Sequence, residues 1–138
     1  MNKQELRITY AKIRKFIENK ASLSDIITNT VLKTSVYANS KNIGIYVNLS
    51  EEVSTKKLIL QSFADKKTVS VPVVEGQDIN FYTINHLDDL CNTGAFGIKE
   101  PIPSKNRLVN KNSIDLLIIP GICFDIYGNR IGSGKRIL

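Results

Sequence analysis

The amino-acid sequence predicts a three-layer α/β domain with a largely parallel central sheet. Helical and strand-like segments alternate in the first half of the chain, an order that builds a parallel sheet covered by helices. Later, residues 115–119 form an almost continuous apolar run. Strands covered on both faces of a parallel sheet have that composition, whereas half-exposed strands alternate. The expected element order is helix, helix, strand, helix and three further strands.

The first helix is predicted over residues 3–18. Its apolar side chains recur at helical spacing and are expected to face the core: Leu6, Tyr10, Ile13 and Ile17. Beside them lie Lys3, Arg7 and Arg14, within roughly 40° of one another on a helix of 3.6 residues per turn. This cationic stripe is either an ordinary solvated face or, at Lys3 and Arg7, a contact with a phosphate-bearing ligand.

A second helix is predicted from the N-cap cluster at Ser22 to about residue 37. Its buried side is expected to consist of Ile26, Ile27, Val31 and Leu32. The third helix, residues 56–65, follows a capping residue at Ser54 or Thr55. Its inward side chains are expected to be Leu58, Ile59, Leu60 and Phe63.

Four β-rich segments are the candidate strands: residues 43–47, 68–74, 79–84 and 115–119. Pro120-Gly121 ends the last one, because proline has no N–H for the ladder and glycine permits positive φ. Glu51 and Glu52 fall in the loop between the first strand and the third helix. In open α/β sheets ligands bind at that carboxyl edge, although a solvated loop carboxylate is the alternative for Glu52.

Length and composition exclude several classes of protein. A chain of 138 residues with 42% hydrophobic and 23% charged residues is typical of a single globular domain. It has no apolar run of about 20 residues and no secretory signal, so we expect a cytoplasmic protein with no membrane contact. Cys91, Cys123 and His86 have no metal-ligand spacing. The net charge of +6 favours an anionic partner. The basic residues are dispersed and Trp is absent, so nucleic acid is not the expected partner.

The segment Arg130-Ile-Gly-Ser-Gly-Lys135 places two glycines beside two cations. Exposed backbone N–H groups flanked by positive charge can hold an anion. The segment is not a Walker A loop, because five residues rather than four separate Gly128 from Gly134-Lys135, and Arg136 replaces the hydroxyl residue. Spacing alone therefore indicates an anion-binding α/β domain.

Longer motifs carry a resemblance. In chain order they are Lys3-Gln-Glu-Leu-Arg7, Glu52-Val-Ser-Thr55, Val71-Pro72, Gly97-Ile-Lys-Glu100-Pro101, and Asp115-Leu-Leu-Ile-Ile-Pro-Gly-Ile-Cys-Phe-Asp125-Ile-Tyr-Gly-Asn-Arg130-Ile-Gly-Ser-Gly134. Together these motifs, which run over almost the whole chain, resemble those of the 5-formyltetrahydrofolate cyclo-ligase (5,10-methenyltetrahydrofolate synthetase) family.

The resemblance implies a NagB/RpiA/CoA transferase-like fold and an ATP- and Mg²⁺-dependent ligase of folate metabolism. ATP would phosphorylate the formyl oxygen of 5-formyltetrahydrofolate, N10 would attack the activated carbon, and phosphate would leave. The implied ATP-binding residues are Lys3, Gln4, Glu5, Leu6, Arg7, Arg130, Ile131, Gly132, Ser133, Gly134 and Lys135, of which Arg130 and Lys135 would be catalytic. Val47 and Glu52 would line the folate pocket. No protein ligand to a metal is assigned, and a monomer is expected.

The chain departs from the family pattern at its last residues. Members continue with Gly-Tyr-Tyr-Asp-Arg and further elements, whereas this sequence has Arg136, Ile137 and Leu138. We therefore expect a single domain, 1–138, that is missing its C-terminal elements and has weak or absent activity. The alternative function is that of a catalytically inactive remnant or nucleotide-binding module of the same family.

Overall fold

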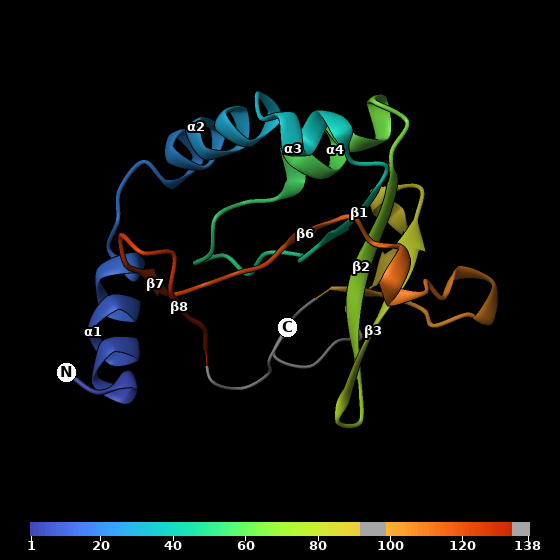
Figure 1. The fold of residues 1–138 in the computed structure, drawn as a ribbon. Helices are drawn as coiled ribbons and strands as arrows, with labels where there is room; N and C mark the ends of the chain where they lie inside the picture. Colours follow the sequence, from blue (N-terminus) through green and yellow to red (C-terminus); the bar gives the residue numbers. More distant parts are fainter. Residues whose placement is uncertain (92–98, 134–138) are drawn as a thin grey trace.

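A four-stranded mixed sheet forms the centre of the computed structural model, which describes residues 1–91 and 99–133 (Figure 1). Strand β1 (Asn42–Ile45) pairs in parallel with β2 (Thr68–Glu75) and with β6 (Leu116–Ile118). Strand β3 (Asp78–Ile84) is antiparallel to β2, which gives the order β3-β2-β1-β6. The predicted α/β fold with a largely parallel sheet is confirmed.

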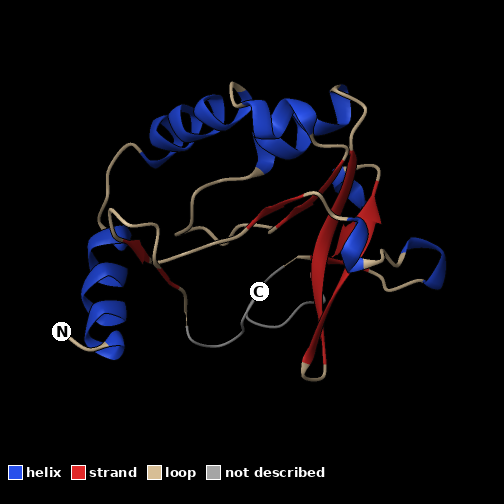
Figure 2. Ribbon diagram, viewed as in Figure 1, coloured by secondary structure: helices blue, strands red, loops and turns tan. Residues whose placement is uncertain are grey.

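Three helices cover one face of this sheet: α2 (Lys20–Leu32), α3 (Ser35–Asn39) and α4 (Lys56–Ala64) (Figure 2). The core between them comprises Tyr37, Ile43, Ile45, Leu58, Ile59, Val69, Val71 and Ile84. Residues two apart on β1 and on β2 share that face, as the period of a strand requires.

The edge strand β6 is less covered than its composition suggests. Leu116 and Ile118 pack against the core, but the side chain of Leu117 points to the other face and is 43% exposed. The expectation that this run is covered on both faces is therefore wrong for the described residues. The start of the strand is secured instead by hydrogen bonds between Asp115 and the start of β1.

Helix α1 (Lys3–Lys15) lies apart from the sheet (Figure 1). It ends three residues before the predicted boundary and has no buried residue. Tyr10, Ile13 and Ile17 are 40–52% exposed, so the prediction that the apolar stripe faces the core is wrong. The reason is that α1 contacts the strand β7 (Cys123–Phe124) of a small hairpin rather than the sheet.

The predicted second helix is two helices. Thr34 separates α2 from α3, because its hydroxyl accepts a hydrogen bond from the backbone N–H of Tyr37 and caps the new helix. Ile26 and Ile27 face solvent rather than the core, as does Leu60 on α4. Runs of consecutive apolar residues exceed what one face of a helix can bury, so some of them remain outside.

The remaining described elements are short. They are η1 (Leu87–Asp89), β4 (Leu90–Cys91), β5 (Glu100–Pro101), η3 (Lys105–Arg107), η4 (Lys111–Ser113) and β8 (Arg130–Ile131). Strands β7 and β8 form an antiparallel hairpin. Within residues 1–91 and 99–133, no helix is both long and apolar enough to cross a membrane.

Candidate functional site

The two cationic segments, 125 residues apart in sequence, meet in the structure. The Nε of Arg7 on α1 donates a hydrogen bond of 3.0 Å to the backbone carbonyl of Gly132, just after β8. Asn2 caps α1 by accepting from the backbone N–H of Glu5 at 2.8 Å, which fixes the first turn that carries Lys3. The contact therefore holds Arg7 against the segment that contains Gly132, and Lys3 lies about one turn earlier on the same helix.

Hydrogen bonds to the carboxylate of Asp125 stabilise the turn of the β7–β8 hairpin. This carboxylate accepts hydrogen bonds from the backbone N–H groups of Tyr127 and Asn129 and from the amide side chain of Asn129. These bonds, led by that of the Asn129 side chain, lower the pKa of Asp125 below its usual range. Gly128 completes the turn with φ of +86°. The hairpin that precedes Gly132 is thus fixed by its own turn.

The side chain of Arg130 links this hairpin to the end of the preceding segment. Its Nη1 donates a hydrogen bond of 2.7 Å to the carbonyl of Pro120. The guanidinium lies under Gly132, where an added Cβ would be 2.9 Å from the same Nη1. Gly121 does not have a positive φ, so positive φ is not the reason for a glycine after Pro120. Glycine is needed there for space, because a Cβ would lie 2.6 Å from the ring of Phe124.

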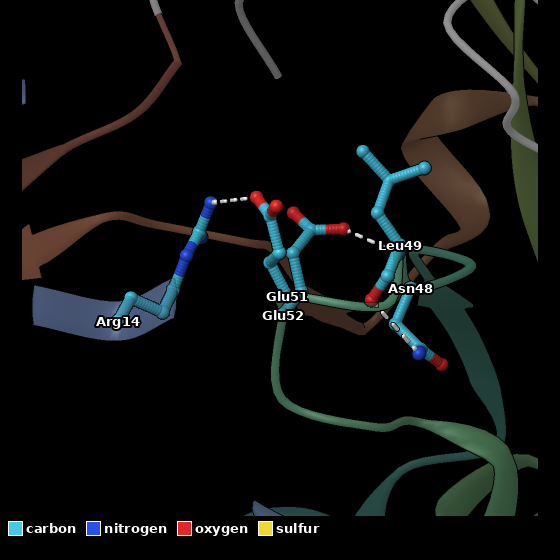
Figure 3. A network of polar contacts seen from close by, with 5 residues as sticks. All are labelled: Arg14, Asn48, Leu49, Glu51 and Glu52. Carbon is cyan, nitrogen blue, oxygen red and sulfur yellow. Dashed lines mark hydrogen bonds and ion pairs between the residues drawn. The ribbon is translucent and has the colours of Figure 1, made fainter. Parts of the chain in front are cut away.

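Val47 and Glu52, the predicted folate residues, belong to the loop between β1 and α4. Val47 is half-buried and packs against the core cluster. The Oε1 of Glu52 accepts a hydrogen bond of 2.7 Å from the backbone N–H of Leu49, and its own N–H donates to the carbonyl of Leu49 (Figure 3). The loop is therefore closed on itself, with the second carboxylate oxygen of Glu52 left for other partners.

Helix α1 also reaches this loop, through a residue that the sequence did not assign to the site. The Nη2 of Arg14 lies 3.8 Å from Oε2 of Glu51 (Figure 3). Burial and the charge of Glu52 raise the pKa of Tyr46 to about 12, and the positive charge of Arg14 partly offsets this. Glu52 and Arg14 thus act in opposite directions on the same buried phenol. The signal in the sequence was the position of Arg14 on the cationic stripe.

The other predicted site residues are only partly brought together. Lys3, Gln4, Glu5 and Ser133 are exposed, while Leu6, Arg7, Arg130, Ile131 and Gly132 are half-buried. Gly134 and Lys135, with the proposed catalytic amine, lie outside the described residues. No three His, Cys, Asp or Glu side chains cluster as a metal site within the described ranges.

A shallow hollow on the helical layer is a separate feature. It lies between α2 and α4 and is lined by Asp25, Ser54, Lys56, Lys57, Leu60 and Gln61. None of the predicted ATP or folate residues belongs to it. The predicted site residues lie instead on α1, the β7–β8 hairpin and the β1–α4 loop.

The fold and the paired cationic segments are those of an α/β domain suited to an anionic ligand. Residues 1–136 match the model of the 5-formyltetrahydrofolate cyclo-ligase family. The chain belongs to this family. The predicted family resemblance is confirmed.

Individual relatives agree with this assignment. The chain is 30% identical to the 5-formyltetrahydrofolate cyclo-ligase of Haemophilus influenzae, with 97% of this chain and 75% of the relative covered. It is 28% identical to the enzyme of that name from Mus musculus, covering 96% of this chain and 66% of the relative. The solved structure of the Aquifex aeolicus 5,10-methenyltetrahydrofolate synthetase superposes with a TM-score of 0.84 at 30% identity, covering 98% of this chain and 69% of that one. The chain thus spans about two thirds to three quarters of the length of these relatives.

Proposed function

We propose that this protein converts 5-formyltetrahydrofolate to 5,10-methenyltetrahydrofolate with consumption of ATP. The observation that carries the proposal is the contact between Arg7 and Gly132, which joins the two predicted nucleotide segments within a chain that matches the family over residues 1–136. In the reaction, the formyl oxygen takes the γ-phosphoryl group and ADP leaves. N10 then attacks the formyl carbon and loses its proton to solvent, the carbon–oxygen bond breaks, and inorganic phosphate is released.

The chain's own residues would stabilise the negative charge that develops during phosphoryl transfer. Such reactions depend on cations and backbone N–H groups placed around the transferred group. Lys3 and the guanidinium of Arg7 would supply the cations on one side. Because the Nε of Arg7 is bound to Gly132, its guanidinium is already oriented before ATP arrives. Arg130 would stabilise the hairpin through Pro120.

The folate side of the site would be the β1–α4 loop. A carboxylate can accept hydrogen bonds from the ring N–H groups of a pterin, and Glu52 is the predicted acceptor. Its bond to Leu49 fixes one oxygen and hence the direction of the other. Val47, two residues after the end of β1, would contribute an apolar contact.

The described residues do not by themselves form a Mg²⁺ site. Mg²⁺ prefers oxygen ligands, whereas the segments around Gly132 are cationic and the carboxylate of Asp125 is occupied by its turn. The partners expected under this proposal are ATP and the folate, with a cytoplasmic monomer as the acting form.

The test is a turnover assay with 5-formyltetrahydrofolate, ATP and Mg²⁺. We expect the methenyl-folate absorbance band to grow in proportion to enzyme concentration, with one ADP released for each product formed. Reactions without ATP, or with a non-hydrolysable analogue, are the controls. Binding of both ligands without product formation would contradict the proposed reaction.

A further inference from the structure

We propose that Arg14 binds an anionic oxygen of a substrate, and that Glu51 is the counter-charge displaced when this substrate enters. The inference rests on the proposed function, since it takes ATP and the folate as ligands. It adds a binding residue on the last turn of α1 to the predicted residues near its start.

The first observation is an unpaired donor. The Nε of Arg14 is buried and has no hydrogen-bond partner in the part of the chain that the structure describes. Most buried polar groups in folded proteins are hydrogen-bonded, because an unpaired one loses water and gains nothing. The side chain as a whole is 21% exposed, so the guanidinium is still open to a ligand at one edge.

The second observation is the weakness of the contact that Arg14 does make. Its Nη2 and Oε2 of Glu51 are 3.8 Å apart, which is beyond hydrogen-bond distance. The side chain of Glu51 is 50% exposed, and ion pairs between exposed groups contribute little to stability. Arginine forms its strong contacts as a two-pronged donor. The geometry therefore leaves that capacity unused in the free protein.

The third observation is the position. Arg14 lies seven residues after Arg7, about 10 Å along the helix axis, on the same cationic stripe. In Figure 3 its guanidinium extends from α1 toward the β1–α4 loop, beside Glu52. The hydrogen bond that Glu52 accepts comes from the backbone N–H of Leu49 rather than from Arg14. Arg14 thus stands between the predicted nucleotide residues and the predicted folate loop.

The ligand chemistry is an anionic oxygen that accepts two hydrogen bonds. Two substrates offer it: the phosphoryl oxygens of ATP and the carboxylates of the folate. Binding would turn the guanidinium so that its Nε, now buried and unpaired, contacts the ligand, and would release Glu51 to water. The exchange predicts opposite effects at the two residues, since Arg14 attracts the ligand and Glu51 competes with it.

The experiment measures binding by calorimetry, separately for a non-hydrolysable ATP analogue and for 5-formyltetrahydrofolate. We expect Arg14→Met to weaken one ligand by about tenfold or more, as loss of a charged hydrogen bond does. Glu51→Gln should strengthen the same ligand, by roughly two- to fivefold. Arg14→Lys keeps the charge but has no Nε, and should recover only part of the affinity. The affected ligand identifies the oxygen as phosphoryl or carboxylate.

Lys12→Met is the matched control, because Lys12 is an exposed cation on the same helix. Thermal midpoints of all variants exclude unfolding as the cause. If Arg14→Met binds each ligand as tightly as the unmodified protein does, the inference is overturned. The inference is also overturned if Glu51→Gln weakens ligand binding as much as Arg14→Met does. Equal losses would mean that the ion pair only supports the structure, since removing either partner breaks it. If the variants change ligand affinity as expected but the protein does not turn over substrate, the proposed reaction is contradicted and the binding role of Arg14 is not.

Discussion

Asp115 and Asn42 hold each other by two reciprocal hydrogen bonds. The backbone N–H of Asp115 donates to the carbonyl of Asn42, and the N–H of Asn42 donates to the carboxylate of Asp115, each at 3.0 Å. The same carboxylate accepts from the N–H of Lys41. The strand β6 thus begins in register with β1, and the Pro120 turn and the β7–β8 hairpin follow from there.

Replacement of Asp115 by alanine should therefore destabilise the fold. Loss of the carboxylate leaves the backbone N–H groups of Lys41 and Asn42 without this acceptor, and we expect the free energy of unfolding to fall by about 1 to 2 kcal/mol. Urea unfolding followed by circular dichroism measures this. Asp25→Ala, at an exposed carboxylate of α2, is the control. Equal urea midpoints for Asp115→Ala and the unmodified protein would contradict the structural role.

The contact between Arg7 and Gly132 predicts a change in ATP affinity with little change in stability. Arg7→Met removes a cation from the nucleotide segments but no core contact, since α1 has no buried residue. We expect ATP to bind about tenfold more weakly and the thermal midpoint to shift by no more than a few degrees. Calorimetric titration and a melting curve give the two values. Lys15→Met on the same helix should leave both unchanged, and unchanged ATP affinity in Arg7→Met would remove that residue from the site.

Glu52 can be tested with two variants that separate loop geometry from charge. A glutamine still accepts the N–H of Leu49 through its Oε1, so Glu52→Gln should retain the fold of the loop. It should bind the folate about tenfold more weakly, because a neutral acceptor forms weaker hydrogen bonds than a carboxylate. ATP affinity should not change. Glu52→Ala should also lower thermal stability. If Glu52→Gln binds the folate as well as the unmodified protein, the carboxylate has no role in the pocket.

The raised pKa values of two tyrosines predict how the stability of the protein changes at high pH. Burial, together with the hydrogen bond to Asp65, raises the pKa of Tyr37 to about 12, and burial with Glu52 raises that of Tyr46 to about 12. Their unfolded value is about 10. Above that pH the unfolded state releases protons that the folded state retains, so stability should fall as pH rises from about 10 to about 12. Tyr46→Phe should flatten this fall. Phenolate absorbance measured against pH should show late-titrating phenols that decrease by one in the variant.

The fold was predictable because strands and helices are local patterns. Residues 68–74 and 79–84 became β2 and β3 with small changes of boundary, and α4 begins at Lys56 as predicted. Burial was less predictable, because the stripe of Tyr10, Ile13 and Ile17 indicates a helix without saying what covers it. The role of β6 as an edge strand likewise depends on its neighbours.

Site residues that belong to sequence motifs were predictable. A residue that joins the site only through a tertiary contact was missed. Arg7 and Gly132 belong to two motifs, and their meeting follows from the fold. The pairing of Arg14 with Glu51 needs the angle between α1 and the β1–α4 loop, which no spacing gives. Glu100 belongs to a motif but is 7% exposed and accepts the N–H of Val74. Its geometry is that of a structural group rather than of a ligand contact.

The turn of the β7–β8 hairpin offers a test of whether hairpin geometry sets nucleotide affinity. Gly128 has φ of +86° and Gly76, in the β2–β3 turn, has φ of +64°. Neither glycine has an atom within 4 Å of where a Cβ would lie. Alanine at either position should therefore cost about 1 kcal/mol through backbone strain alone. Only Gly128→Ala should also weaken ATP binding, because its hairpin leads directly into Gly132. Gly128→Asn should recover affinity, since asparagine tolerates positive φ better than alanine. ATP affinities that are equal in Gly128→Ala and Gly76→Ala would show that the conformation of this turn does not reach the nucleotide site.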